Sequence, residues 1–304
     1  MPRNRSRSRS NAAVVVFTHR PDVSPWERVG LEQCAAVLGR HDLHLVCPRG
    51  MPTDAYEALL PGLRIVHVPP RRMAGYLAYS NLKTSSMLFR HFGERYRFTL
   101  CHEPDVFVFR DELDEWCERG FHYVGAPFWK PAPEPGGEPF MPGGGNSGFS
   151  LRDNDAHIRV NRTLRLLERP GSFRRAPAGS PWSAELRDLP LVTIKALGIG
   201  NSTNEWLRNP YLRWRGNTFY EDVFWSQMVP EVLPWFRVAD PMTSLGFSFE
   251  LEVERCFELA GGRLPVGCHG WYRFALDLWR PHIEALGHVL PDHVEFPPHG
   301  SEDG

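Results

Sequence analysis

Two carboxylates one residue apart, Glu103 and Asp105, are the side chains of this sequence best suited to chemistry. They lie in residues 101–109 (CHEPDVFVF), an otherwise apolar segment with the composition of a strand. Residues i and i+2 of a strand project to the same side, so the two carboxylates should repel each other unless a cation lies between them. Mg²⁺ and Mn²⁺ take such oxygen ligands and complete their shell with substrate phosphates and water. The pair therefore indicates a metal and diphosphate site; a turn cap at Glu103 and a solvated Asp105 are the simpler alternative.

A second acidic pair and a glycine-rich segment add further candidates. Glu221 and Asp222 precede an apolar run and are predicted to open a helix, where the helix dipole favours acidic residues. Capping of the helix N-terminus would by itself explain both carboxylates. Residues 143–148 (GGGNSG) permit close approach of the backbone to a ligand, and Asn146 offers both a donor and an acceptor, although a plain flexible turn is the alternative. The strand predicted next carries Arg152, which can pair with a carboxylate or a phosphate.

The elements that must position these residues alternate between strand and helix patterns. Apolar and periodic runs predict three strands and three helices: residues 12–18, 43–47 and 63–68, and residues 25–40, 53–60 and 80–92. This alternation predicts βαβ units on a mainly parallel sheet, whose ligands bind outside the carboxyl ends of the strands. Glu103 and Asp105 fall in that position. Two Pro-rich segments, residues 130–145 and 170–190, are predicted to be loops over the site, the second a mobile lid.

Composition and charge limit the class of protein. The 304 residues are 42% hydrophobic with ten Trp, which predicts a sizeable core in one large domain or two packed halves. The net charge of −1 gives no electrostatic case for nucleic acid as a partner. No run approaches the roughly 20 apolar residues of a membrane span, and no signal peptide is recognised. The six irregularly spaced cysteines favour reduced, mostly buried thiols and a cytoplasmic location over a disulfide framework.

Four sequence blocks together resemble one family. They are residues 121–128 (FHYVGAPF), 145–152 (GNSGFSLR), 221–225 (EDVFW) and 264–271 (LPVGCHGW). In that order and spacing the chain resembles the bacterial and fungal family of domain of unknown function 5672, whose members are thought to be GT-A-like glycosyltransferases. Three shorter segments also fit the pattern of this family: residues 75–82, 106–113 and 247–250. The resemblance covers roughly residues 13–290.

The resemblance implies a GT-A-like fold, which is α/β with a Rossmann-like, mainly parallel central sheet flanked by helices. It implies a single domain over residues 12–294, with a nucleotide-sugar half at 12–128 and an acceptor and catalytic half at 129–294. The arginine-rich residues 1–11 have no apolar core and are predicted to be a disordered basic tail. Residues 295–304 are predicted to be a flexible tail.

The same resemblance assigns chemistry to the acidic pairs. The Glu-Asp-Val sequence is similar to the motif of inverting GT-A enzymes, in which a carboxylate deprotonates the acceptor hydroxyl. Asp222 is then the predicted base, and Glu221 a sugar or support contact. His269, between two glycines, is predicted to join Asp105 and Glu103 on Mn²⁺ or Mg²⁺, or to contact the diphosphate. A structural role is the alternative for this histidine.

The predicted contacts to the nucleotide and sugar come from several parts of the chain: Asn81, Lys83, Glu103, Asp105, Asn146, Ser147, Gly148 and Trp271. A solvated helix face is the alternative for the first two, and burial in the core is the alternative for the tryptophan. The chain departs from the family pattern at Glu103, where the family usually has Gln, and at Ser147, where it usually has Gly. Asp105 is therefore the more dependable metal ligand. The serine should be tolerated if its backbone does not need a positive φ.

The activity implied is metal-dependent transfer of a sugar from a nucleotide-sugar donor, with a UDP-sugar as the first candidate. The acceptor would be a hydroxyl of a glycan, a peptide or a small molecule. A retaining enzyme of the same fold is one alternative, and a non-catalytic nucleotide- or glycan-binding protein with a transferase-like fold is another. Because the chain keeps both acidic pairs, an inactive homologue is the weaker hypothesis.

Overall fold

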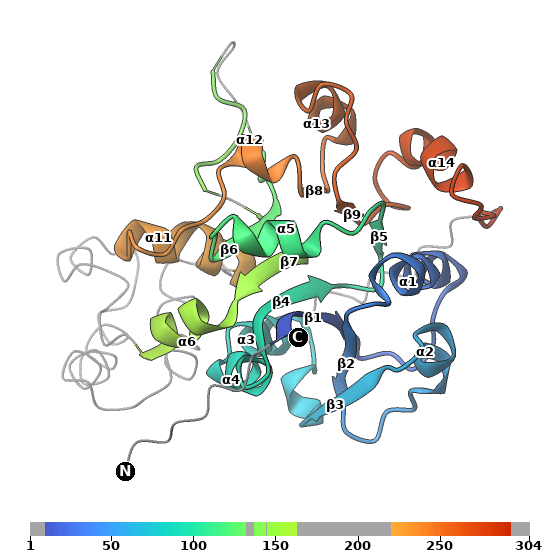
Figure 1. The fold of residues 1–304 in the computed structure, drawn as a ribbon, viewed down its shortest axis with the longest axis horizontal. Helices are drawn as coiled ribbons and strands as arrows, with labels where there is room; N and C mark the ends of the chain where they lie inside the picture. Colours follow the sequence, from blue (N-terminus) through green and yellow to red (C-terminus); the bar gives the residue numbers. More distant parts are fainter. Residues whose placement is uncertain (1–9, 132–136, 144, 163–219, 293–304) are drawn as a thin grey trace, which may run out of the picture.

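A mixed six-stranded sheet forms the centre of the protein (Figure 1). Its strands are β1 (Ser10–Phe17), β2 (Asp42–Pro48), β3 (Arg64–Val68), β4 (Tyr96–His102), β6 (Tyr123–Ala126) and β7 (Asn146–Asp153), in the order β3-β2-β1-β4-β7-β6. β1 pairs in parallel with β2 and β4, and β2 with β3, whereas β7 runs antiparallel to β4 and β6. This computed structural model describes residues 10–131, 137–143, 145–162 and 220–292. The predicted α/β fold with a mainly parallel sheet is confirmed.

Helices cover both faces of this sheet. The first face carries α1 (Pro25–Leu38), α2 (Asp54–Leu59) and α5 (Leu113–Glu118), and the second carries α3 (Tyr76–Lys83), α4 (Ser86–Gly93) and α6 (Asn154–Arg162). β1 is apolar from Ala12 to Phe17 because its alternate side chains enter two different cores. Val14 packs with the first group of helices and Val15 with the second. A parallel strand buried on both faces needs this continuous apolar sequence.

Helix α1 holds the chain close to the acidic pair. It begins at a capping box in which Ser24 and Glu27 satisfy each other's backbone N–H groups. Its Gly30 faces the chain that follows β4: a Cβ at this position would lie 2.3 Å from the carbonyl oxygen of Val106. Only glycine permits so close an approach of the helix to that segment.

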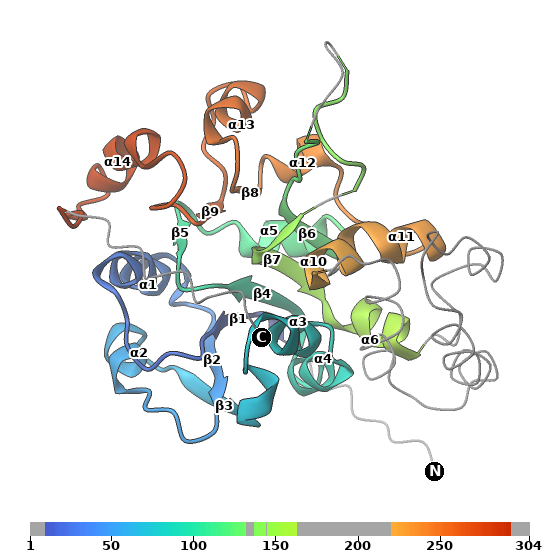
Figure 2. The same cartoon turned by 180° about the vertical axis from the view of Figure 1, so that it is seen from behind.

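A smaller three-stranded sheet lies beside the central sheet and next to α1 (Figures 1 and 2). Its strands are β5 (Val106–Val108), β9 (Gly267–His269) and β8 (Ser248–Phe249), in that order. α13 (Val253–Leu259) and α14 (Leu276–Glu284) pack with it around Phe107 and Trp279. β9 is antiparallel to β5, with Val106 opposite His269. This pairing brings the C-terminal part of the chain to the turn that carries the acidic pair.

The remaining described elements connect these layers. They are the short turn η1 (Pro70–Arg72), the helices α10 (Glu221–Val223), α11 (Val229–Val232) and α12 (Pro241–Ser244), and the π-helical segment η3 (Phe224–Met228). α10, η3 and α11 follow one another without a break, and Trp225 anchors them in the core. The predicted helix start at Glu221 is confirmed, as is the predicted strand around Arg152, which lies in β7.

Two predictions about the elements are wrong in detail. The single helix predicted over residues 80–92 is two helices, because the side chain of Ser85 accepts a hydrogen bond from the amide of Met87 and starts α4 anew. The acidic pair does not lie within one strand: β4 ends at His102, and residues 103–105 form a turn before β5. The predicted lid at residues 170–190 and the tail at 295–304 lie outside the described residues, as does most of the N-terminal tail.

The described residues also bear on the predictions about membranes and thiols. Within them, no helix has the length and apolar character needed to cross a bilayer. All six cysteines are buried and free, which confirms the prediction of buried thiols. Burial raises the pKa of the Cys34 thiol to about 12, so this side chain behaves as a core residue.

Candidate functional site

A cavity of about 590 Å³ opens where β1 and β4 reach their carboxyl ends. Thr18 follows β1 on one side of the cavity, and Glu103 and Asp105 follow β4. β7 adds its first three residues, and the chain ahead of η3 adds Glu221 and Asp222. The cavity therefore lies where ligands bind in open α/β sheets, and both acidic pairs line it.

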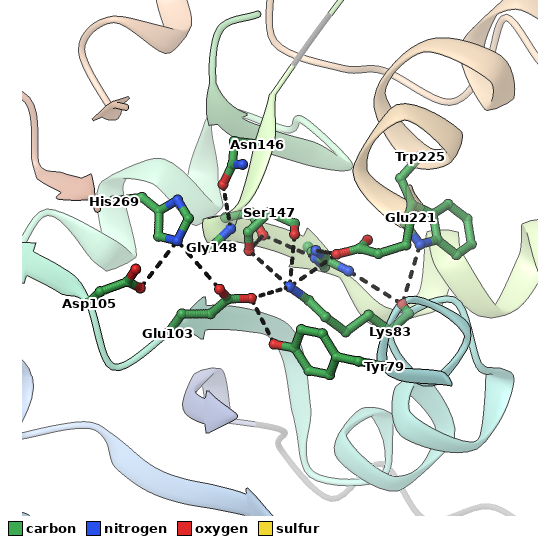
Figure 3. Close-up of polar contacts among 12 residues, drawn as sticks. Tyr79, Lys83, Glu103, Asp105, Asn146, Ser147, Gly148, Glu221, Trp225 and His269 are labelled. Carbon is green, nitrogen blue, oxygen red and sulfur yellow. Dashed lines mark hydrogen bonds and ion pairs between the residues drawn. The ribbon is translucent and has the colours of Figure 1, made fainter. Parts of the chain in front are cut away.

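Two carboxylates and one imidazole converge at one end of the cavity (Figure 3). His269 Nε2 lies 3.2 Å from Asp105 Oδ1 and 3.4 Å from Glu103 Oε2. One ligand atom from each of the three residues lies within 4.8 Å of the other two. The sequence placed Glu103 and Asp105 together, and the pairing of β5 with β9 adds the histidine.

The turn that carries the two carboxylates is held by its backbone. The amide of Glu103 donates to the carbonyl of Gly148 at 2.9 Å, and the amide of Val106 donates to the carbonyl of Glu103 at 3.1 Å. The amide of Gly270 donates to the carbonyl of Asp105 at 3.0 Å. Gly270 has φ 63, a conformation that favours glycine. β7 and β9 thus fix the turn from both sides, and the carboxylates project into the cavity.

The imidazole of His269 fits against backbone that has no side chain. A Cβ at Gly148 would lie 2.2 Å from Cδ2 of the ring, so any other residue there would displace the ring. Burial alone would lower the pKa of His269, but Asp105, Glu103 and Glu250 hold it well above its usual value. The imidazole therefore carries a proton between the carboxylates when no other cation is present.

Lys83 lies beneath the cavity as a buried cation. Its Nζ donates to Glu103 Oε1 and to Ser147 Oγ, each at 2.8 Å, and forms an ion pair with Glu221 Oε1 at 3.0 Å (Figure 3). The side chain is 1% exposed. Burial alone would lower the pKa of Lys83, but Glu103, Tyr79 and Glu221 hold it well above its usual value. Lys83 thus joins the turn after β4, the start of β7 and the start of α10.

Glu221 and Asp222 have opposite electrostatic environments although they are adjacent. Glu221 accepts from Arg152 at 3.0 Å and pairs with Lys83; although burial would raise its pKa, these two cations hold it below the usual value. Asp222 is 6% exposed and accepts a hydrogen bond from the amide of Val223 at 2.8 Å. Burial and the charge of Glu221 raise the pKa of Asp222 to about 7. A carboxyl group with such a pKa can exchange a proton at neutral pH.

The structure brings most of the predicted site residues together. The cavity is lined by Glu103, Asp105, Asn146, Ser147, Gly148, Glu221, Asp222 and His269. Lys83 contacts three of these residues from inside the protein, Glu103, Ser147 and Glu221, so it is not free for the predicted direct contact with a ligand. Asn81 does not line the cavity. The prediction that Trp271 stacks on a sugar or base is corrected: it is fully buried, with its ring 5.5 Å from that of Trp26, so the core alternative holds.

Three residues that the sequence did not single out belong to the site. Oε1 of Glu250 forms a hydrogen bond with Nδ1 of His269 at 2.8 Å. The hydroxyl of Tyr79 donates to Oε1 of Glu103 at 2.7 Å. Arg273 Nη2 lies 3.5 Å from Asp105 Oδ2 and lines the cavity. Tyr79 and Glu250 lie within segments 75–82 and 247–250, which fitted the family pattern, whereas Arg273 lies two residues beyond the block 264–271 and gave no sequence signal.

Both departures from the family pattern contact Lys83. Glu103 pairs with its ammonium, and Ser147 accepts a hydrogen bond from it. Glu252 and Ala275 are the non-glycine residues with positive φ in the described chain, so Ser147 meets the condition that its backbone φ is not positive. The described part of the predicted loop 130–145 contributes no residue to the cavity.

The cluster of Glu103, Asp105 and His269 has the donor set of a divalent metal site. Two carboxylate oxygens and one imidazole nitrogen suit Mn²⁺ or Mg²⁺, and the adjoining cavity leaves room for phosphate oxygens and water. Lys83 binds Oε1 of Glu103, so Oε2 of the same carboxylate remains directed at the cluster.

Comparison with known proteins places the chain in a family. A family model described as "Protein of unknown function (DUF5672)" matches residues 62–269. The chain belongs to this family. The range matched by the DUF5672 model contains both acidic pairs and ends at His269. No curated protein matches the sequence.

Solved structures with a similar fold include glycosyltransferases at low sequence identity. The galactosyltransferase LgtC, in complex with donor and acceptor sugar analogues, has a TM-score of 0.46 at 13% identity, over 92% of this chain and 98% of that chain. Mouse xyloside xylosyltransferase 1, in its apo form, has a TM-score of 0.45 at 11% identity, over 86% of this chain and 97% of that chain. Core-mannan synthase A from Aspergillus fumigatus, in its Mn/GDP form, has a TM-score of 0.37 at 12% identity, over 73% of each chain.

Gly148→Ala should weaken metal binding without removing a ligand. The added Cβ would meet the ring of His269 at 2.2 Å and push Nε2 away from Asp105. We expect Mn²⁺ affinity, measured by calorimetric titration, to fall about 10- to 100-fold, as when the support of a metal ligand is lost. Gly246→Ala is the matched control, because its Cβ would meet nothing closer than 3.3 Å and no atom of the site. Equal affinity of Gly148→Ala and the parent would contradict this account of the ring's position.

Lys83→Met should destabilise the fold. The variant keeps the apolar stem but leaves the partly exposed Glu103 and the buried Glu221 without their shared cation, and only Arg152 still pairs with Glu221. We expect the free energy of unfolding, measured in urea, to fall by about 3–5 kcal/mol. Arg280→Met breaks an exposed ion pair with Glu284 and should lower it by less than about 1 kcal/mol. If the two variants lose the same stability, the buried network does not anchor the site.

Proposed function

We propose that this DUF5672 protein is a metal-dependent glycosyltransferase that moves a sugar from a nucleotide-sugar donor to an acceptor hydroxyl, with inversion at the anomeric carbon. One observation carries the proposal: a single cavity has a metal-type donor set at one end and, in Asp222, a carboxyl group with a pKa of about 7 among its other lining residues. Its volume of about 590 Å³ lies in the range of small-ligand sites.

The donor end of the cavity suits a diphosphate. Glu103, Asp105 and His269 would hold Mn²⁺ or Mg²⁺, which when bound neutralises the charge that develops on the departing nucleoside diphosphate. Arg273, which is 40% exposed and faces Asp105, adds a cationic group for a phosphate oxygen. A UDP-sugar is the first donor to test.

The acceptor end supplies the base. Asp222 takes the proton of the acceptor hydroxyl as its oxygen attacks the anomeric carbon, and the bond from that carbon to the diphosphate oxygen breaks. Glu221 keeps its charge because Lys83 and Arg152 hold it, and burial together with that charge raises the pKa of Asp222 to about 7. The glycan, peptide or small-molecule acceptor would bind beside this pair.

Substitutions at the two ends of the cavity separate donor binding from turnover. Titration with UDP-, GDP-, CMP- and dTDP-sugars, with and without Mn²⁺, should find one nucleotide class whose binding requires the metal. Asp105→Ala should abolish this binding by removing a ligand. Asp222→Asn should retain it but lower kcat by about 100- to 10,000-fold, the usual contribution of a general base. Asp277→Asn, an exposed substitution on α14, is the control.

The possible outcomes distinguish the functional classes. Metal-dependent donor binding without turnover in the parent would support the non-catalytic binding protein. Full activity in Asp222→Asn would remove the assigned base and favour a retaining mechanism. If no nucleotide sugar binds in the presence of Mn²⁺, the transferase proposal fails.

The pH dependence should report Asp222. Burial and Glu221 raise its pKa to about 7, and only the deprotonated carboxylate accepts a proton, so kcat/KM should rise with pH through an acidic limb near pH 7. Glu221→Gln removes the neighbouring negative charge, so the limb should move to lower pH by about one unit. Measuring kcat/KM as a function of pH for the parent and for Glu221→Gln tests the assignment of this limb to Asp222. A limb that does not move would assign it to another group.

A further inference from the structure

Glu250 lies directly behind the metal-type cluster, on the side of His269 opposite the two carboxylates. Its Oε1 is 2.8 Å from His269 Nδ1, and its side chain is 12% exposed. It follows β8, whose Phe249 is fully buried and pairs with Cys268 of β9. The two strands thus carry Glu250 and His269 side by side out of the smaller sheet, in a fixed register.

The contacts of His269 leave its ring one orientation. Gly148 lies against Cδ2, Glu250 lies at Nδ1, and Asp105 and Glu103 lie at Nε2. An ionised carboxylate can only accept a hydrogen bond, so Glu250 requires a proton on Nδ1. In the neutral ring the lone pair then falls on Nε2, the nitrogen that faces the other two carboxylates.

We infer that Glu250 is a positioning residue that fixes the Nδ1–H tautomer of His269 and directs the Nε2 lone pair at the metal site of Glu103 and Asp105. This inference rests on the metal site of the proposed function. Ligating histidines commonly donate their other N–H to a carboxylate, which sets the tautomer and the ring orientation. Glu250 also lines the cavity, but in this role it acts through the imidazole.

Two substitutions at Glu250 separate the hydrogen bond from the charge. In Glu250→Leu nothing accepts from Nδ1, so Mn²⁺ affinity, measured by calorimetry on the full chain without nucleotide, should fall about 10- to 100-fold. In Glu250→Gln the amide oxygen can still accept, so most of the affinity should return. Glu254→Gln, an exposed acidic position on α13, is the control for loss of charge and should match the parent.

The tautomer itself gives a readout independent of affinity. Nitrogen NMR of the ¹⁵N-histidine-labelled protein, loaded with Zn²⁺ as a diamagnetic probe, should show Nδ1 of His269 protonated and Nε2 bound to the metal. The same pattern is expected in Glu250→Gln. Because the parent alone gives this signal, the test does not depend on whether Glu250→Leu folds.

The outcomes are distinct from those of the transferase test. If the parent binds Mn²⁺ and Glu250→Leu binds it equally well, or if Nε2 carries the proton in the loaded parent, the positioning role is overturned and the metal site stands. If the parent binds no Mn²⁺, the metal site and this role fall together. If Glu250→Leu alone loses affinity while no sugar is transferred, the positioning role stands without the transferase.

Discussion

The ion pairs of one buried ammonium hold the site together. Lys83 comes from the end of α3 and binds groups from three other segments: Glu103 after β4, Ser147 at the start of β7, and Glu221 at the start of α10. These segments are far apart in sequence, and two of them carry negative charge into the interior. A buried carboxylate without a partner is strongly unfavourable, so the shared cation is what allows two of them to lie near one cavity. Arg152 adds a second buried cation beside Glu221.

The network binds one carboxylate oxygen of each glutamate in the interior. Glu103 gives Oε1 to Lys83 and Tyr79 and directs Oε2 at His269. Glu221 gives Oε1 to Lys83 and Arg152, and its charge then raises the pKa of the adjacent Asp222. The same buried cations therefore prepare both ends of the cavity. At one end Glu103 Oε2 stays directed at His269, and at the other burial and Glu221 raise the pKa of Asp222 to about 7.

The smaller sheet completes the site from the opposite side. β5 continues the chain from the acidic turn, β9 pairs with it and delivers His269, and β8 delivers Glu250. Glycine at position 148 is needed where this sheet meets β7, because the imidazole lies against its backbone. The range matched by the DUF5672 model includes Gly148, Glu250 and His269, together with β4 and β7 of the central sheet and all three strands of the smaller sheet, whereas β1 and β2 precede it.

The sequence by itself determined the fold class and the chemical character of the site. Apolar runs and their spacing predicted the parallel sheet, because strands buried on both faces need such runs, and the local motifs marked Glu103, Asp105 and Asp222. Only the tertiary structure decided which residues meet. Trp271 lies in the core and Lys83 is a structural cation because of burial that no local pattern records. Glu250 meets His269 because β8 pairs with β9, and β9 reaches the acidic turn because it pairs with β5, which is more than a hundred residues away in sequence. The same distinction applies to the charged groups. The sequence gives the position of each carboxylate, but its pKa is set by the burial and the neighbouring charges that result from folding.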